Sequence, residues 1–311
     1  MYTSKKLGNQ KSQGRAFKAI SILLLTILVL IAAGCSNAKP SKIVIATKGN
    51  TESNIMQQLL KQIVEENTSI NVETVKLDNS ILWEAVKKGD VDVYVEYTGT
   101  ALMNILKQEP ERDPDAVYNK VKKMLEEQEN LTMLDPLGFD STYAFALRKE
   151  VADQYGIANL TQLAEHSSQL KFAADPMIEK SSRPDGYRLV NEAYGFKFKE
   201  LVGISNPTLQ LEALKNKEAD VMITIATKGI FEVNNLVPLE DDKHIFLPYY
   251  AAPLVRNETL EAHPELKEVL NKLSNKVSIE AIREMNRQVD AEEKKPEDVV
   301  RAWLKQEGFL K

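Results

Sequence analysis

The chain has 311 residues, 43% of them hydrophobic, and its 45 acidic side chains outnumber the 40 basic ones, for a net charge of −5 at pH 7. This length allows about two domains of roughly 150 residues each. The single cysteine, Cys35, excludes a disulfide bond within one chain.

The first 34 residues have the pattern of a secretion signal. Five basic side chains and no acid precede an uncharged run, AISILLLTILVLIAA at 19–33, and Gly34 and Cys35 follow it. Such a pattern is typical of a secretory signal, whereas a spanning helix needs about 20 apolar residues. A lone thiol directly after AAG resembles a lipoprotein processing site, although an ordinary signal with an incidental cysteine is the alternative. We predict a signal peptide at 1–34 and a lipidated tether at 35–41, with Cys35 anchoring the chain at the extracytoplasmic face of the cell membrane.

The charge of the remaining chain narrows the class of partner. From Cys35 onward the basic count falls to 35 (40 less the five in the signal) against 45 acidic residues, so the net charge is −10. A nucleic-acid binder needs clustered Lys and Arg to contact phosphates, and this part of the chain has no such cluster. The acidic balance favours small cationic or zwitterionic partners instead.

Strands and helices alternate in the first half of the chain. The run KIVIATKGN predicts a buried strand at 43–46, and TESNIMQQLLKQIVEEN predicts an amphipathic helix at 51–67 with Thr51 as its N-cap. A strand is expected at 70–77. Residues 80–108 then read as helix, glycine stop, strand, turn and helix, and 113–130 as a further helix. This order is typical of a mostly parallel sheet with crossover helices.

The second half repeats the alternation and ends in helices. Residues 141–156 predict a strand followed by a helix, 170–175 a strand, and 187–196 a short helix closed by Gly195. Residues 208–229 again predict helix, strand and turn. In the helical tail, 264–310, Ser278 and Pro296 begin helices and Gly308 ends the last one.

One stretch of the first half recurs in the second. WEAVKKGDVDVYVEYTG from residue 83 and LEALKNKEADVMITIAT from residue 211 share Glu, Ala, Lys, Asp and Val at a constant offset of 128 residues. By this offset Asp92 matches Asp220, and Tyr97 matches Ile225. The repeat indicates two similarly built lobes that each offer a helix–strand–turn unit to a shared cleft.

No catalytic or metal-binding motif stands out. The three histidines, His166, His244 and His263, lie far apart in sequence and outside any HExxH pattern, so we expect no metal site and no cofactor. The chain also lacks G-x-S-x-G, Walker and G-x-G-x-x-G motifs. A hydrolase that uses a pair of carboxylates stays open as an alternative, because acidic residues are plentiful.

Several motifs, in the same order along nearly the whole chain after the signal, resemble the substrate-binding lipoproteins of osmoprotectant ABC transporters, which take up glycine betaine, carnitine, choline and proline betaine. These motifs are ATKGNTESNI (46–55), EYTGTAL (96–102), GFDSTYAFAL (138–147), RPDGYRLVNEAYGF (183–196), LPYYAAPLV (247–255) and MNRQVD (285–290). The resemblance implies an α/β, type II periplasmic-binding-protein fold. Lobe 1 would comprise 42–142 plus 247–311, lobe 2 would comprise 143–246, and a ligand cleft would lie between them.

The resemblance also implies a function and a set of partners. The protein would be no enzyme; it would bind a small quaternary-ammonium or zwitterionic ligand and deliver it to an ABC permease that works with an ATPase. Its box of aromatic rings would include Tyr97, Tyr143 and Tyr249. Ile225 stands where many members have a further box tyrosine, and Asn50 where an apolar residue is common. These changes leave open a different ligand in the same fold, and the family includes members with other substrates, ergothioneine among them.

Polar residues near the expected strand ends complete the predicted site. Glu96 is expected to face the positive end of the ligand. Thr98 begins the next helix, whose free N–H groups favour an anionic end, and Thr51 opens the equivalent first helix. The alternatives are a salt-bridged Glu96 and a Thr51 that only caps its helix.

Overall fold

The computed structural model describes residues 42–180, 183 and 186–310. The predicted signal peptide, the tether and Cys35 lie outside these residues. Within the described part, no helix combines the length and the apolar character needed to cross a bilayer.

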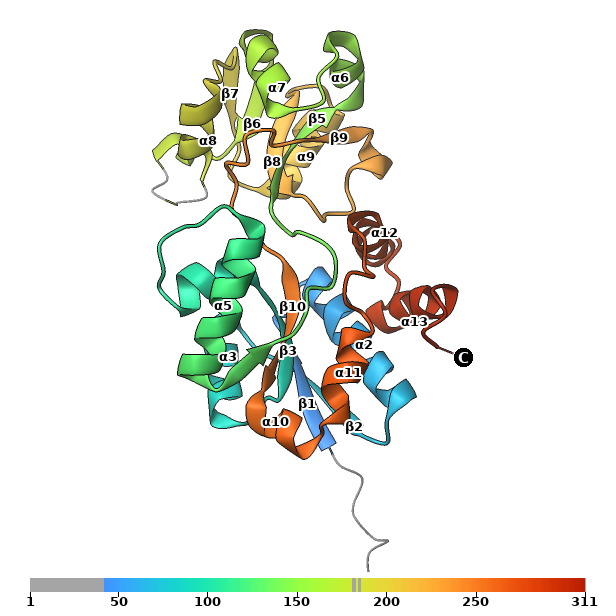
Figure 1. Cartoon of the computed structure of the whole chain (residues 1–311). Helices are drawn as coiled ribbons and strands as arrows, with labels where there is room; N and C mark the ends of the chain where they lie inside the picture. The colour runs from blue at the N-terminus through green and yellow to red at the C-terminus, as the bar shows by residue number, and fades with distance from the viewer. Residues whose placement is uncertain (1–41, 181–182, 184–185, 311) are drawn as a thin grey trace, which may run out of the picture. The chain divides into compact units, whose positions relative to one another are not determined.

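The described chain forms two five-stranded sheets with helices packed around them (Figure 1). The first sheet has the order β2-β1-β3-β10-β4 and the second the order β7-β6-β8-β5-β9. The strands of the first sheet are β1 (Lys42–Thr47), β2 (Asn71–Lys76), β3 (Val93–Tyr97), β4 (Leu131–Met133) and β10 (Ala251–Arg256). Those of the second are β5 (Tyr143–Arg148), β6 (Lys171–Ala174), β7 (Glu200–Gly203), β8 (Val221–Ile225) and β9 (Leu236–Leu239).

Each sheet contains one antiparallel strand. β10 runs antiparallel to β3 and β4, and β5 runs antiparallel to β8 and β9, whereas β1 and β6 pair in parallel with their neighbours. Both antiparallel strands directly follow a passage between the sheets, which we call the first crossing (134–142) and the second crossing (240–250). The predicted mostly parallel α/β architecture is confirmed. The lobe borders after residues 142 and 246 stay a prediction.

Helices fill the connections. Those before the first crossing are α2 (Thr51–Asn67), α3 (Asn79–Lys88), α4 (Thr98–Thr100), the π-helix η1 (Ala101–Ile105) and α5 (Pro114–Glu129). Those between the crossings are α6 (Lys149–Tyr155), α7 (Leu160–His166), η2 (Ser167–Gln169), η3 (Ile178–Lys180), α8 (Tyr187–Tyr194), α9 (Pro207–Lys215) and η4 (Glu232–Asn234). Those after β10 are α10 (Asn257–Ala262), α11 (Glu265–Asn271), α12 (Ile279–Asp290) and α13 (Pro296–Gln306).

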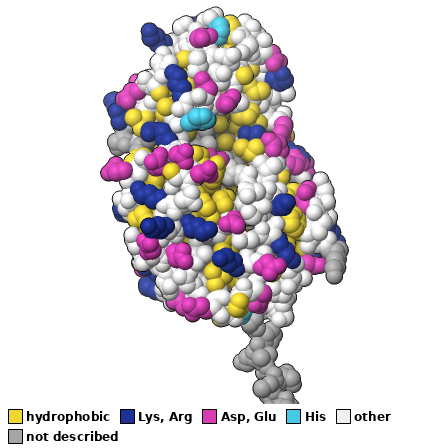
Figure 2. All heavy atoms as spheres, in the orientation of Figure 1, with side chains coloured by type: hydrophobic (Ala, Val, Ile, Leu, Met, Phe, Trp, Pro, Cys, Tyr) yellow, Lys and Arg dark blue, Asp and Glu magenta, His cyan; other side chains and the backbone are white. Residues whose placement is uncertain are grey.

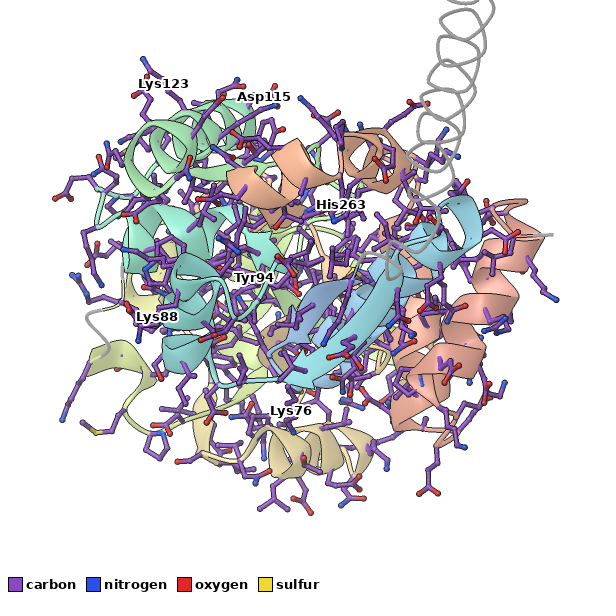
Figure 3. The ribbon with its side chains drawn as sticks, turned by 90° about the horizontal axis from the view of Figure 1, so that it is seen from below. Lys76, Lys88, Tyr94, Asp115, Lys123 and His263 are labelled. Carbon is purple, nitrogen blue, oxygen red and sulfur yellow. The ribbon has the colours of Figure 1, made fainter. Side chains whose placement is uncertain are left out.

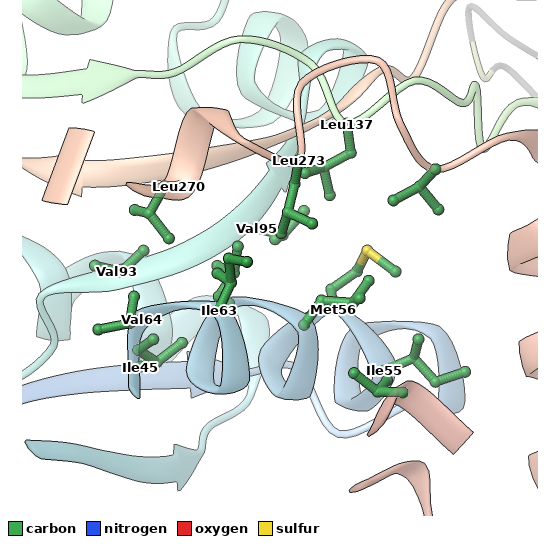
Figure 4. Close-up of a cluster of buried hydrophobic side chains, with 14 of the residues drawn as sticks. Ile45, Ile55, Met56, Ile63, Val64, Val93, Val95, Leu137, Leu270 and Leu273 are labelled. Carbon is green, nitrogen blue, oxygen red and sulfur yellow. The ribbon is translucent and has the colours of Figure 1, made fainter. Parts of the chain in front are cut away.

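Helix α2 shows how apolar spacing becomes packing. Its buried face includes Ile55, Met56 and Ile63, all fully inaccessible to solvent, at the spacing of an amphipathic helix. In Figure 4 side chains of this face point toward Val93 and Val95 of β3, and Leu270 of α11 lies in the same cluster. The core of the first sheet is therefore completed by helices from the far end of the chain, and these fix the position of the first turn of α2.

The start of α2 corrects one prediction. Asn50, not Thr51, is the N-cap: its side chain accepts a hydrogen bond from the Ser53 amide at 2.9 Å. Thr51 is the first helical residue, and its hydroxyl donates to Asp290 of α12 at 2.5 Å. Asn and Thr both accept hydrogen bonds from free amides at a helix start, so their order in sequence does not decide which one caps.

The sequence repeat occupies equivalent places in the two sheets. β3 and β8 are both third in order, after their parallel neighbours β1 and β6. Just before each, an aspartate accepts a hydrogen bond from the neighbouring strand at 2.8 Å: Asp92 from the Val44 amide and Asp220 from the Lys171 amide. The shared aspartates therefore join the third strand to the second in both sheets, and the ends of β3 and β8 present Tyr97 and Ile225 at matching positions.

Candidate ligand-binding site

A cavity of about 800 Å³ is bounded by residues from both sheets and from the crossings. Elements before the first crossing contribute Asn50, Glu52, Tyr97, Thr100 and the 103–110 segment. The crossings and β5 contribute Ser141, Tyr143 and Tyr249. The turn after β8 contributes Ile225, Thr227 and Lys228, while Arg183 and Asn286 of α12 complete the wall. Its size lies in the range of small-molecule sites, which are typically 300–1,000 Å³.

Tyr97 stands at the end of β3 on the cavity wall. Its hydroxyl donates a hydrogen bond to Glu52 Oε1 at 2.5 Å. Burial and then the Glu52 charge raise the pKa of Tyr97 well above its usual value, so the phenol keeps its proton. Donation to a carboxylate leaves the ring richer in electrons, which strengthens its attraction for a cation.

Tyr143 and Tyr249 come together from β5 and the second crossing. Their rings meet edge to face with centroids 6.5 Å apart, an arrangement that aromatic pairs favour. The turn Thr98–Thr100 approaches them closely: a Cβ on Gly99 would lie 2.7 Å from the Pro248 carbonyl oxygen and 2.9 Å from the Tyr249 ring. Glycine in the EYTGT motif therefore allows the end of β3 to pack against the second crossing.

Ile225 and Asn50 also lie on the cavity wall. Ile225 is paired across strands with Tyr143 and is 37% exposed, which is high for a large apolar side chain in a sheet. At the position equivalent to Tyr97, the second sheet thus presents a branched aliphatic surface in place of a ring.

Glu96, Thr98 and Thr51 do not reach the cavity. Glu96 is only 3% exposed, and its carboxylate accepts from Lys48 Nζ at 2.6 Å, from the Tyr97 amide and from the Tyr94 hydroxyl. Figure 3 shows Tyr94 deep among the strands, whereas Lys123 and Asp115 lie at the periphery. The positive group that Glu96 faces is therefore an internal lysine.

Thr98 is fully buried and joins the end of β3 to the second crossing. Its hydroxyl accepts from the Tyr250 amide at 3.0 Å and donates to the Pro248 carbonyl at 3.3 Å. The threonine thus holds the chain that carries Tyr249. Its contribution to the site is to position that ring.

Glu52 is a wall residue that the sequence analysis did not predict. Its carboxylate accepts from Tyr97 and also from the Ser141 hydroxyl at 2.9 Å, and Asn286 Nδ2 lies 3.4 Å from it. Both residues lie in motifs that the sequence analysis singled out, Tyr97 in EYTGTAL (96–102) and Glu52 in ATKGNTESNI (46–55). However, only the fold brings the first turn of α2 beside the end of β3.

Polar contacts link α12 to the turn after β8. Asn286, 2% exposed, donates to the Thr227 carbonyl at 2.8 Å, and Arg283 Nε donates to the Ala226 carbonyl at 2.6 Å. The Thr227 hydroxyl lies 3.2 Å from the Ser141 hydroxyl. These bonds bring residues of both sheets and of the first crossing together beside Glu52.

No histidine is among the described residues that line the cavity. On the face shown in Figure 2 the histidine side chains lie apart from one another among charges of both signs. Within residues 42–180, 183 and 186–310, no group of three His, Asp or Glu side chains could hold a metal ion.

The sequence profile of one family, the substrate-binding domain of ABC-type glycine betaine transport systems, matches residues 41–306. The chain belongs to this family. It is 33% identical over 298 residues to the carnitine transport binding protein OpuCC of Listeria monocytogenes strain 10403S, covering 93% of this chain and 96% of that protein. The similar proteins are binding components of transporters.

Two further comparisons bear on the fold and the range of ligands. The crystal structure described as a glycine betaine/carnitine/choline ABC transporter superposes with a TM-score of 0.79 at 31% identity, over 86% of this chain and 99% of that one. The ergothioneine transport permease/binding protein of Helicobacter pylori strain G27 is 29% identical over 96% of this chain and 54% of its own length. Members of one fold therefore carry names for chemically different ligands.

Proposed function

We propose that the protein binds a small quaternary-ammonium or zwitterionic compound, of the betaine, carnitine or choline type, in this cavity and passes it to an ABC permease. The observation that supports the proposal most is that Tyr97, Tyr143 and Tyr249 all line this one cavity. A quaternary ammonium has no N–H to donate, so aromatic faces and shape are the means of recognising it, at about 0.5–2 kcal/mol per well-placed ring.

The mechanism requires binding and closure but no chemistry on the ligand. Residues from both sheets line the cavity, so a bound ligand would favour the arrangement in which the two sheets approach each other. A carboxylate-pair hydrolase is not favoured, because the similar proteins are binding components of transporters. Lipidation at Cys35 would hold the protein beside its permease, and loss of fatty-acid labelling in Cys35→Ala would test this anchor.

A thermal-shift panel tests the ligand class. Choline, carnitine or glycine betaine should raise the melting temperature of the wild-type protein by several degrees. Tyr97→Ala should abolish this shift, while Tyr155→Ala, which lies outside the cavity, should keep it. If none of the three compounds raises the melting temperature of the wild type, the proposal is contradicted.

Ile225 supports a second candidate, the same fold with a different small compound. An exposed aliphatic side chain beside Tyr143 suits a flat ring better than a trimethylammonium group. A shift with ergothioneine, which joins a thioimidazole ring to a betaine group, but with none of the three compounds that lack a ring would favour this candidate.

A further inference from the structure

Two glutamates flank Tyr97, and they differ in their partners. Glu96 is the residue before Tyr97, is only 3% exposed and is paired with Lys48 at 2.6 Å. Glu52 lies on the cavity wall, where its hydrogen-bond donors are a phenol, an alcohol and an amide, all neutral. Within the part of the chain that the structure describes, Glu52 forms no ion pair with a lysine, arginine or histidine. Among these residues, its negative charge is therefore met by hydrogen bonds and not by a salt bridge.

A half-buried carboxylate without a positive partner is costly unless a cation comes to it. The cavity beside Glu52 is where a ligand would supply that charge. Because a quaternary ammonium offers no N–H, it would leave the bonds from Tyr97 and Ser141 intact. It would then gain from the ring and from the carboxylate together.

The same charge repels a carboxylate on the ligand. The cations on the wall, Arg183 and Lys228, come from between the two crossings, whereas Glu52 comes from α2. A ligand carboxylate is therefore repelled by Glu52 and attracted by these two cations, so its place relative to Glu52 decides its energy. Glycine betaine has a single CH₂ between its two charges, carnitine has a longer spacing, and choline carries no carboxylate.

We propose, on the basis of the function proposed above, that Glu52 is the anion against which the cleft binds the positive end of its ligand. Glu52 thereby ranks ligands by the distance between their positive charge and any carboxylate of their own. The expected order of affinity is choline, then carnitine, then glycine betaine.

Calorimetric titration of the full-length protein with four probes tests this. The probes are choline, carnitine, glycine betaine and 3,3-dimethylbutan-1-ol, the uncharged carbon isostere of choline. In Glu52→Gln, which keeps the shape and an acceptor for Tyr97, choline should bind about tenfold to a hundredfold more weakly. The variant should bind the isostere within about twofold of the wild-type affinity, and its affinity for glycine betaine should not fall. Glu65→Gln, on the exposed face of the same helix, removes the same net charge and is the matched control.

The outcomes separate a charge role from a structural one. Equal weakening of choline and its isostere in Glu52→Gln would mean that Glu52 only holds Tyr97 and Ser141 in place, and it overturns the inference. An unchanged affinity of Glu52→Gln for choline also overturns the inference. A wild-type protein that binds glycine betaine more tightly than choline does the same, and that measurement does not depend on the folding of any variant. A wild type that binds none of the charged probes instead refutes the proposed function itself.

Discussion

The buried pair of Lys48 and Glu96 allows a direct test of how the interior beside Tyr97 is stabilised. The side chains are only 10% and 4% exposed, and Nζ lies 2.6 Å from the carboxylate. Lys48→Met keeps most of the apolar stem but leaves Glu96 charged in the interior, with only the Tyr94 hydroxyl and the Tyr97 amide as donors. Removing one partner of a buried pair lowers the free energy of unfolding by about 3–5 kcal/mol. Because two hydrogen bonds to Glu96 remain, we expect a loss of about 3 kcal/mol.

Urea unfolding followed by circular dichroism measures this loss. The control is Lys149→Met, which breaks an exposed pair with Asp153 (side chains 53% and 64% exposed) and should cost about 0.5 kcal/mol or less. The double variant Lys48→Met/Glu96→Gln should recover part of the stability, because no uncompensated charge is then buried. Equal costs for the two lysine substitutions, or a double variant as unstable as the sum of the singles, would refute the reasoning.

Two further predictions concern the contacts between elements. A Cβ in Gly229→Ala would lie 2.4 Å from the Arg287 amide nitrogen, so the turn after β8 must move away from α12 and lose its hydrogen bonds to Arg283 and Asn286. The Kd for the ligand should therefore rise about tenfold, whereas Gly203→Ala, the control, should change it little. Equal Kd values for the two variants would contradict this prediction. Burial raises the pKa of Asp140 to about 6 from 3.8, so the folded state holds that proton more tightly, and the stability this adds below pH 4 should be lost as pH rises through 6. From pH 4 to pH 7, the unfolding free energy of the wild type should therefore fall relative to that of Asp140→Asn. If the difference between the two proteins is the same at both pH values, the prediction is wrong.

Local chemistry allowed most elements to be predicted. Apolar residues at helical spacing in 51–67 correspond to α2, the strand expected after the glycine stop within 80–108 corresponds to β3, and Gly195 ends α8 with a positive φ of 74°. These signals act over a few residues, so they can be recognised without knowing the fold. The failure at Thr51 is of the same local kind, since two neighbouring residues were both able to cap.

The sequence by itself determined most helices, the repeat at an offset of 128 residues and the motifs that carry the tyrosines, but it did not predict strands β4, β7, β9 and β10. Only the tertiary structure decided which carboxylate beside Tyr97 meets the cavity. Neighbouring side chains on β3 point to opposite faces, so the side chain of Glu96 turns inward to Lys48. Glu52, 45 residues away in the chain, is brought to Tyr97 because helices from both ends of the chain pack around β3. Long-range packing of this kind leaves no mark in local periodicity.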